Sequence, residues 1–273
     1  MDWKLAARDL LPPALRRGLR ALRAGQGARF AGPYGSWEAA AAAATGYDAA
    51  EILGKVRAAA LAVKRGEAVF ERDSVRFMKP EPPVELLAVL LRSAAAHSGR
   101  VSVLDFGGSL GSTYFQCRPF LTGIASLRWS VVEQQAFVAC GRREFESDEL
   151  LFFDTIEEAA RAEPARIAVL SSVLQYLPDP AAIARRITDA QPDAILIDRT
   201  PVHDRPDDSI VVQHVAPAIY RASYPFRIFG RDRLPMLFGG RYLPAATLPD
   251  TPFDALERQH GARYIGMVLE PGT

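Results

Sequence analysis

Short apolar runs alternate with amphipathic stretches through the middle of the chain. The runs lie at residues 101–104, 129–132, 150–153, 167–170 and 194–197, and helix-like stretches follow at 113–121, 135–144, 156–162 and 180–190. Runs this short, bounded by turn residues, are typical of buried parallel strands. Two later runs, 241–247 and 264–269, predict a final strand pair. The pattern therefore predicts an α/β fold with a mostly parallel seven-stranded sheet and right-handed crossovers.

The first 80 residues have a different pattern. Ser36 is typical of a helix N-cap before an alanine-rich helix, and a second helix is expected over 49–64. Residues 30–34 are expected to form a turn-rich loop, and 70–78 to be extended or irregular before a proline-rich break. We predict a helical N-terminal region over 1–80 that packs on the ligand cleft, followed by the α/β domain over 81–273.

The alternation of strands and helices stops after the fifth strand. About thirty residues rich in Asp, Pro, His and Tyr follow, and the next helix is expected only near 231–238. Long connections at the ligand-binding end of a sheet often carry function. We therefore expect residues 198–224 to form the acceptor side of a site.

Composition narrows the classes of function. Hydrophobic residues make up 49% of the 273 positions and the net charge is +1, so the total charge does not favour a nucleic-acid partner. The two cysteines, Cys117 and Cys140, argue against a disulfide framework and favour the cytoplasm. No apolar run reaches membrane-spanning length.

A basic amphipathic segment lies near the N-terminus. Leucines recur with helical spacing between Leu10 and Leu22, and four arginines lie between Arg16 and Arg23. Such a helix can lie on an anionic membrane surface. It can equally pack on its own domain or on the second subunit of a homodimer, and the sequence leaves these interpretations open.

The first strand ends in an acid and a glycine turn. Glycines tolerate a sharp strand-to-helix turn, which in such folds lies where nucleotide ligands bind. The dinucleotide pattern G-x-G-x-x-G, counted from Gly107, meets Ser109 and Ser112 and fits poorly. The pattern acid-x-Gly-x-Gly-x-Gly of S-adenosylmethionine (SAM) methyltransferases matches Asp105, Gly107 and Gly111, with Ser109 in place of one glycine. A tight turn without a ligand is the alternative.

A second acid stands at the expected distance. Glu133 ends the next strand, about 20 residues beyond the glycine turn, where a ribose-binding carboxylate belongs in such units. Its two oxygens can accept hydrogen bonds from both ribose hydroxyls. An ordinary glutamate at a strand end is the alternative.

The chain resembles a family of bacterial SAM-dependent methyltransferases associated with cell-surface polysaccharide gene neighbourhoods. The segments that carry the resemblance cover most of the chain: Ser36-Trp37, Gly46-Tyr-Asp48, Leu104-Asp-Phe-Gly-Gly-Ser-Leu-Gly-Ser112, Ser171-Ser-Val-Leu-Gln-Tyr-Leu177, Ile197-Asp-Arg-Thr-Pro201, Gln213-His-Val-Ala-Pro217 and Ile219-Tyr-Arg-Ala-Ser-Tyr-Pro225. The resemblance implies a Rossmann-like class I methyltransferase fold, in which the late strand pair is an antiparallel hairpin. It also implies that SAM is the cofactor.

These observations predict methyl transfer from SAM to an oxygen, or less favourably a nitrogen, of a small molecule or sugar. The alternatives are a non-catalytic SAM-fold protein that partners a glycosyltransferase, and an NAD-dependent nucleotide-sugar enzyme. The candidate cofactor-binding residues are Asp105, Gly107, Gly108, Ser109, Gly111, Glu133, Asp154 and Ser171.

Four further residues are candidates for the acceptor side. Arg199 can hold an anionic group or pair with a neighbouring aspartate, and Tyr176 can reach the methyl group or simply pack. His203 and His214 are candidate general bases, with His214 favoured because it lies in a segment that resembles the family. The histidines are too scattered, and the cysteines unpaired, for a metal motif.

Overall fold

The computed structural model describes residues 28–46, 49–216, 222–251 and 253–272. The basic segment 10–23 and the Tyr47-Asp48 pair lie outside the described residues, as does Tyr220.

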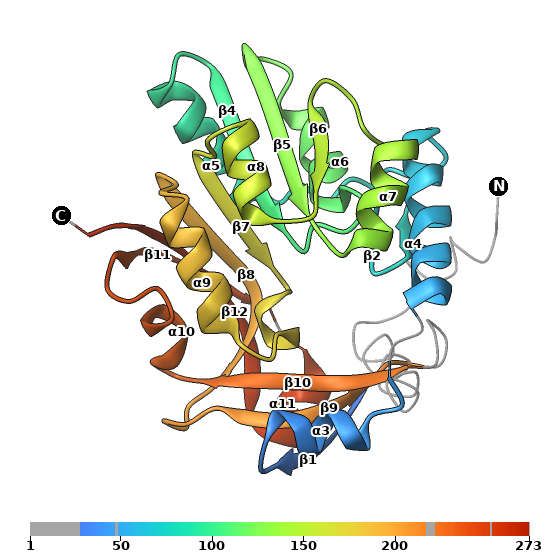
Figure 1. Ribbon diagram of the computed structural model, residues 1–273, viewed down its shortest axis with the longest axis vertical. Helices are drawn as coiled ribbons and strands as arrows, with labels where there is room; N and C mark the ends of the chain where they lie inside the picture. Colours follow the sequence, from blue (N-terminus) through green and yellow to red (C-terminus); the bar gives the residue numbers. More distant parts are fainter. Residues whose placement is uncertain (1–27, 47–48, 217–221, 252, 273) are drawn as a thin grey trace, which may run out of the picture.

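In the described residues, seven strands of a ten-stranded sheet form its central part, in the order β6-β5-β4-β7-β8-β12-β11 (Figure 1). Their bounds are β4 (Arg100–Phe106), β5 (Ser126–Val132), β6 (Leu150–Phe153), β7 (Ile167–Ser171), β8 (Ala194–His203), β11 (Tyr242–Thr251) and β12 (Ala262–Pro271). Strands β4 to β8 are mutually parallel, whereas β12 runs antiparallel to both β8 and β11. This order, with its reversed strand in a late hairpin, confirms the predicted Rossmann-like class I methyltransferase fold.

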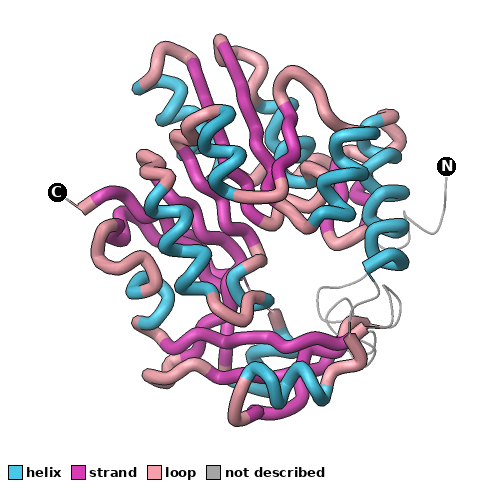
Figure 2. Tube along the Cα trace, viewed as in Figure 1, coloured by secondary structure: helices cyan, strands magenta, loops and turns pink. Residues whose placement is uncertain are grey.

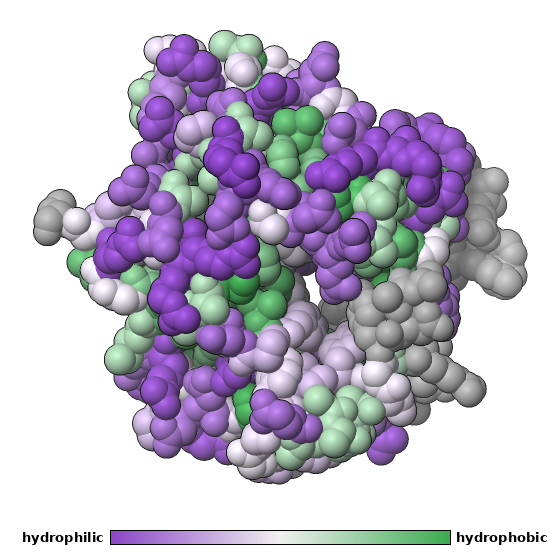
Figure 3. Space-filling view, viewed as in Figure 1, coloured by the Kyte–Doolittle hydropathy of each residue, from purple (hydrophilic) through white to green (hydrophobic). Residues whose placement is uncertain are grey.

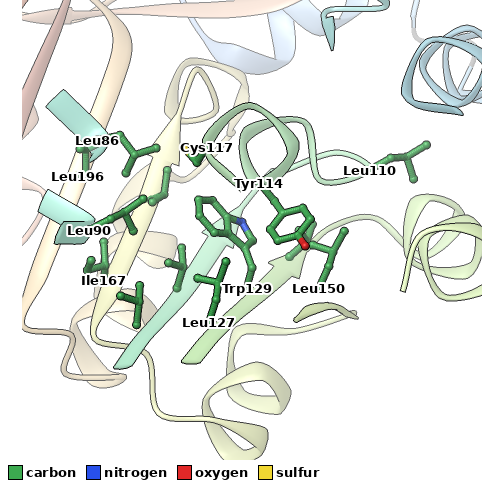
Figure 4. Packing of buried hydrophobic residues seen from close by; sticks show 14 of the residues in the cluster. Leu86, Leu90, Leu110, Tyr114, Cys117, Leu127, Trp129, Leu150, Ile167 and Leu196 are labelled. Carbon is green, nitrogen blue, oxygen red and sulfur yellow. The ribbon is translucent and has the colours of Figure 1, made fainter. Parts of the chain in front are cut away.

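Helices cover both faces of this sheet, as Figure 2 shows. One face carries α4 (Ala49–Lys64), α5 (Val84–Ala96), α6 (Ser112–Cys117) with the 3₁₀ turn η1 (Arg118–Phe120), and α7 (Gln135–Glu144). The other carries α8 (Ile156–Ala162), the 3₁₀ turn η2 (Leu174–Tyr176), α9 (Pro180–Asp189) and α10 (Arg233–Met236). Trp129 is fully buried in the first of these two cores, between the sheet and Tyr114 of α6 (Figure 4).

The segment after the fifth core strand differs from the expected long connection. β8 continues to His203, and the chain returns as β9 (Ser209–His214) and β10 (Ser223–Gly230). β10 pairs antiparallel with β9 and meets the end of β8 in parallel. Val211 of β9 and Phe226 of β10 are buried in one hydrophobic core, so these residues form a β-layer where the polar residues of the segment predicted a loop.

The N-terminal region also contains strands that were not expected. Residues Arg29–Tyr34, predicted as a loop, form β1, which pairs antiparallel with β9. A β-bulge between Ala31 and Tyr34 accommodates Gly32 and Pro33 in this edge strand. Ser36 caps α3 (Trp37–Ala43) as predicted, because its Oγ accepts the Ala39 N–H at 3.1 Å.

Two further elements complete the chain. Residues 70–78 form a hairpin of β2 (Phe70–Arg72) and β3 (Val75–Phe77), and β2 packs on α4 and α6. Helix α11 (Asp254–His260) packs on β12 and β1. Within the described ranges, no helix combines the length and the apolar character needed to cross a membrane.

Alanine substitutions at two helical glycines are expected to have opposite effects on the stability of the protein. A Cβ on Gly141 of α7 would lie 2.4 Å from the buried Phe152 ring, so we expect Gly141→Ala to destabilise the protein by about 1–3 kcal/mol. Gly54 of α4 has open space at its Cβ position, so we expect Gly54→Ala to stabilise the protein by about 0.5–1 kcal/mol. Urea unfolding of both variants measures the difference. Equal stabilities would contradict the close α7–β6 contact.

Candidate functional site

The carboxyl ends of β4, β5, β7 and β8 meet along one edge of the central sheet. The β1-β9-β10 layer lies beyond this edge, and Figure 3 shows the surface hollowed between the two. Residues that follow parallel strands therefore face one cleft, as is common for ligand sites in such sheets.

The glycine turn after β4 is held by its own protein neighbours. Gly107 has φ +75°, and a Cβ there would lie 2.6 Å from Val173. A Cβ on Gly111 would lie 2.9 Å from Leu150. Ser109 also has a left-handed φ, +58°, which costs a residue with a side chain about 1–2 kcal/mol. Packing alone therefore accounts for these glycines, and the evidence for a ligand must come from the side chains around the turn.

Asp105 lies beneath the turn instead of in the cleft. Its carboxyl is 1% exposed and its Oδ2 accepts a hydrogen bond from Trp129 Nε1 at 3.0 Å. A Cβ on Gly108 would lie 2.6 Å from this carboxyl, so the backbone of the turn rests directly on it. Asp105 thus positions the turn, which differs from the direct cofactor contact that the sequence predicted.

Burial raises the pKa of Asp105 to about 7, although the Trp129 hydrogen bond lowers it. The folded carboxyl keeps its proton to a higher pH than the unfolded one, so the protein should lose stability as the pH rises from 3.8 to about 7. Asp105→Asn removes this titration, and we expect its stability to vary less across that window. Urea unfolding at several pH values compares the two. Parallel pH profiles would contradict the raised pKa.

Glu133 reaches the glycine turn from β5. It directly follows the strand, and its carboxyl accepts hydrogen bonds from the backbone N–H groups of Gln134, at 2.6 Å, and of Ser109. Burial raises its pKa, while these two hydrogen bonds lower it. Among the described residues, no cation pairs with this carboxyl. The structure therefore brings Glu133 and Ser109 together, as the spacing predicted.

A polar cluster joins the ends of β7 and β8. Ser171 Oγ donates to Asp198 Oδ2 at 3.1 Å and accepts from Arg199 Nη2 at 2.9 Å. Arg199 has φ +47°, and its carbonyl accepts a hydrogen bond from the fully buried Gln175 at 3.3 Å. A left-handed arginine in a strand is strained, and such strain persists where the surroundings hold it, commonly at functional sites.

Tyr176 has a packing role in this structure. Its hydroxyl donates to Gln213 Oε1 at 3.1 Å, and its ring lies edge-on to Tyr224 and Phe226, with ring centroids 5.3 and 5.4 Å away. Through this hydrogen bond and these ring contacts, Tyr176 packs η2 against the β9-β10 layer.

The two candidate bases lie in different environments. His203 is 1% exposed, its Nε2 lies 2.9 Å from Ser209 Oγ, and burial lowers its pKa. It cannot contact a substrate from this position, so its prediction as a general base is wrong. His214 is exposed at the end of β9, next to Ser223 of β10, and stays a prediction.

Asp154 directly follows β6 and is not part of the polar cluster at the ends of β7 and β8. Its carboxylate is 3.4 Å from Arg142, and Thr155 caps α8 by accepting the Glu158 N–H at 3.2 Å. Thr155, and not Asp154, is therefore the N-cap of α8, and the role of Asp154 toward a cofactor stays a prediction.

The β2-β3 hairpin also lies beside the glycine turn, which the sequence did not predict. Glu71 is 3% exposed; it accepts a hydrogen bond from Ser112 Oγ, next to the glycine turn, and one from the Ser74 N–H at 3.2 Å. The neighbouring Arg72 is partly buried. The feature of the sequence that could have indicated this hairpin is the acidic and basic pair Glu71-Arg72 within a segment predicted to be extended or irregular.

In the described part of the chain, no group of three or more His, Cys, Asp or Glu side chains is arranged to hold a metal ion.

No family model and no curated protein matches the chain. Among solved structures, it is similar to the Burkholderia thailandensis 1,6-didemethyltoxoflavin-N1-methyltransferase with bound 1,6-didemethyltoxoflavin and S-adenosylhomocysteine, at 16% identity over 83% of this chain and 92% of that one, with a TM-score of 0.44. The N-terminal domain of EvdMO1, in the presence of S-adenosylhomocysteine and D-fucose, is 14% identical over 83% and 98% of the two chains, with a TM-score of 0.48.

A SAM-dependent methyltransferase from Clostridium acetobutylicum is 9% identical over 68% and 91%, with a TM-score of 0.45. At such identities and TM-scores, these likenesses assign no residue or ligand to this chain.

Proposed function

We propose that this protein is a SAM-dependent methyltransferase that acts on an oxygen of a small molecule or sugar. The observation that carries the proposal is Glu133, an acid at the end of the second core strand with no cationic partner among the described residues, hydrogen-bonded to the N–H of Ser109 in the glycine turn. A carboxylate held at this point has oxygen lone pairs left for two hydroxyl donors.

The residues at this edge fit a nucleoside with a ribose diol. Glu133 would hold the diol, the turn around Gly107 and Ser109 would line the adjoining backbone, and Asp105 would keep that turn in place from below. When bound, SAM would supply a methyl group on a cationic sulfur. An acceptor oxygen can take this methyl group in an in-line displacement, with the sulfur as the leaving group. These residues suit a nucleoside by their chemistry and by their position, at the edge of the sheet where such ligands bind.

The chain's own contribution to methyl transfer is alignment and charge. The acceptor would lie between the Ser171–Asp198–Arg199 cluster and the β9-β10 layer, which would bring its oxygen toward the cofactor. The acceptor hydroxyl must lose its proton as the new bond forms. His214 is the remaining histidine candidate for that role, and Tyr176 would act through packing.

The proposal extends to the setting of the enzyme. A cytoplasmic location, a role in polysaccharide biosynthesis and an N-terminal region that walls the cleft all follow from the family resemblance and the composition. Contact of the basic N-terminal segment with a membrane or a second subunit is also part of this proposal. That segment lies outside the described residues.

Calorimetry on the full chain tests the proposal. We expect SAM and S-adenosylhomocysteine to bind, and NAD and a nucleotide-sugar to show no binding at the same concentrations. Binding of NAD with no binding of either sulfur nucleoside would overturn it in favour of the nucleotide-sugar enzyme.

A further inference from the structure

Two histidines lie where the central strands of the sheet continue into the β1-β9-β10 layer. His203 is the last residue of β8 and pairs with Gly230 of β10 on one side and with Ala262 of β12 on the other. His260 is the last residue of α11, two positions before Ala262. In Figure 1, β8 runs from the central strands toward this layer and α11. Both imidazoles therefore lie at the junction that carries the layer beyond the cleft.

His203 is enclosed and only partly hydrogen-bonded. It is 1% exposed, and its Nε2 lies 2.9 Å from the Oγ of Ser209 at the start of β9. The other ring nitrogen, Nδ1, is buried and has no hydrogen-bond partner among the described residues. A neutral imidazole carries one proton, whereas the charged form must donate from both nitrogens. Protonation of His203 would therefore bury a charge together with a donor that lacks a well-placed acceptor, which is costly.

His260 is in a similar position on the α11 side. Its Nε2 is also buried without a hydrogen-bond partner among the described residues. Its ring lies edge-on to Phe30 of β1, with ring centroids 6.0 Å apart, and Phe30 belongs to the apolar core that joins Phe226 of β10 to Leu256 of α11. The Phe30 N–H donates to Gln259 Oε1 at 2.8 Å. The contact between α11 and β1 thus includes an imidazole that lies against an apolar core.

The charged groups next to His203 do not compensate a proton on its ring. Burial lowers the pKa of His203, and the positive charge of Arg205 lowers it further, whereas Asp208 and nearby backbone groups raise it. Asp208 is itself 3.1 Å from Arg227 in an ion pair and accepts the Gly230 N–H at 3.0 Å. Its carboxylate is therefore already engaged.

The charges around His260 act in the same direction. Burial lowers the pKa of His260, and the charges of Arg205 and His203 lower it further, whereas the backbone of β1 raises it. Glu257 and Arg258 precede it on α11, and both are exposed.

The remaining acids of the connection between β8 and β9 are paired with arginines of the elements packed around it. Asp204 pairs with Arg231, which follows β10, and with Arg263 of β12. Asp207 pairs with Arg233 of α10. A proton on either imidazole would thus meet carboxylates that already have cationic partners.

We propose that His203 and His260 form an acid-sensitive junction, which holds the β1-β9-β10 layer on the central strands only while both imidazoles are neutral. Protonation of either ring favours a state in which that ring reaches water, and this state requires the layer to separate locally from β8 and β12. Acid would thereby open the side of the cleft that the layer forms, while the parallel strands stay folded. The inference concerns the chain without any ligand and does not depend on the proposed function.

The junction should weaken on the acid side of pH 6.5. An exposed imidazole has a pKa near 6.5, and the pKa of each ring in the closed state is lowered from that value. The open state therefore binds protons first, so the closed state is fully stable above pH 6.5 and loses stability as the pH falls below it. At about pH 5.5, the equilibrium moves toward opening by up to about tenfold for a ring that stays neutral when closed.

Hydrogen exchange of the full chain without ligand, measured by mass spectrometry, tests the junction. Rates at about pH 7.5 and about pH 5.5 are corrected for the pH dependence of exchange itself. Between these conditions, we expect protection in β9 and β10 to fall about threefold to tenfold for each histidine, and protection in β4 and β5 to stay unchanged. An equal loss in both parts of the sheet, or no loss in β9 and β10, would overturn the proposal.

Variants without the titrating rings give the second test. His203→Gln and His260→Gln should each reduce the acid-induced loss of protection at least about threefold. His214→Gln removes an exposed histidine at the end of β9 and is the matched control, which should keep the whole loss. Thermal unfolding at neutral pH shows which variants are folded, and His260→Gln decides the point if His203→Gln does not fold. The same loss of protection in the folded variants as in the wild type would show that these histidines are not the acid-sensitive groups.

Discussion

Trp129→Ala is expected to lower the free energy of unfolding by about 3–5 kcal/mol, the largest effect on stability that we predict. Among the described residues, Trp129 is the largest fully buried side chain, and it packs in the core between β5 and α6. Its removal leaves a cavity and also takes the hydrogen bond from the buried Asp105 carboxyl. An unpaired buried carboxyl adds its own penalty.

Urea unfolding measures this effect against Phe120→Ala, since Phe120 is 42% exposed and its loss should cost well under half as much. Trp129→Phe helps to separate the two contributions, because it removes the donor and keeps most of the volume. A loss below about 1 kcal/mol for Trp129→Ala would contradict the packing described here.

Glu133→Ala is expected to weaken SAM binding about tenfold to a hundredfold, which corresponds to the loss of about 1.5–3 kcal/mol of charge-assisted hydrogen bonding. The reason is that the carboxylate would accept hydrogen bonds from both ribose hydroxyls while it also holds the Ser109 N–H. Since burial raises the pKa of Glu133, SAM affinity of the wild type should fall when the pH is lowered through that pKa. Calorimetry at neutral and mildly acidic pH measures both effects.

Glu133→Gln keeps one acceptor oxygen and should lose less affinity than Glu133→Ala. Asp148→Ala, a change of an exposed acid in the loop before β6, is the control and should bind SAM normally. Unchanged affinity in folded Glu133→Ala would remove the ribose assignment and leave the glycine turn as a tight turn without a ligand.

The local pattern of the chain was sufficient to predict the core strands and most of the helices that cover them. Runs such as 101–104 and 167–170 are apolar because both faces of a central strand are buried, and this requirement can be read from the run itself, without knowledge of its neighbours. The glycine turn and Glu133 were predictable for a related reason: the carboxyl ends of parallel strands lie on one edge, so chain order alone places both residues there.

Only the tertiary structure decided the rest. β1 contains a glycine and a proline that favour a loop, and β9 lies in a segment rich in polar residues. Both form strands because they pair with each other across about 180 residues of the chain. Burial of His203 and Asp105 depends on which elements cover them, which residue type does not show. The local periodicity of the sequence indicates which face of an element is buried. The neighbours of a polar side chain are instead determined by packing between elements that lie far apart in the sequence.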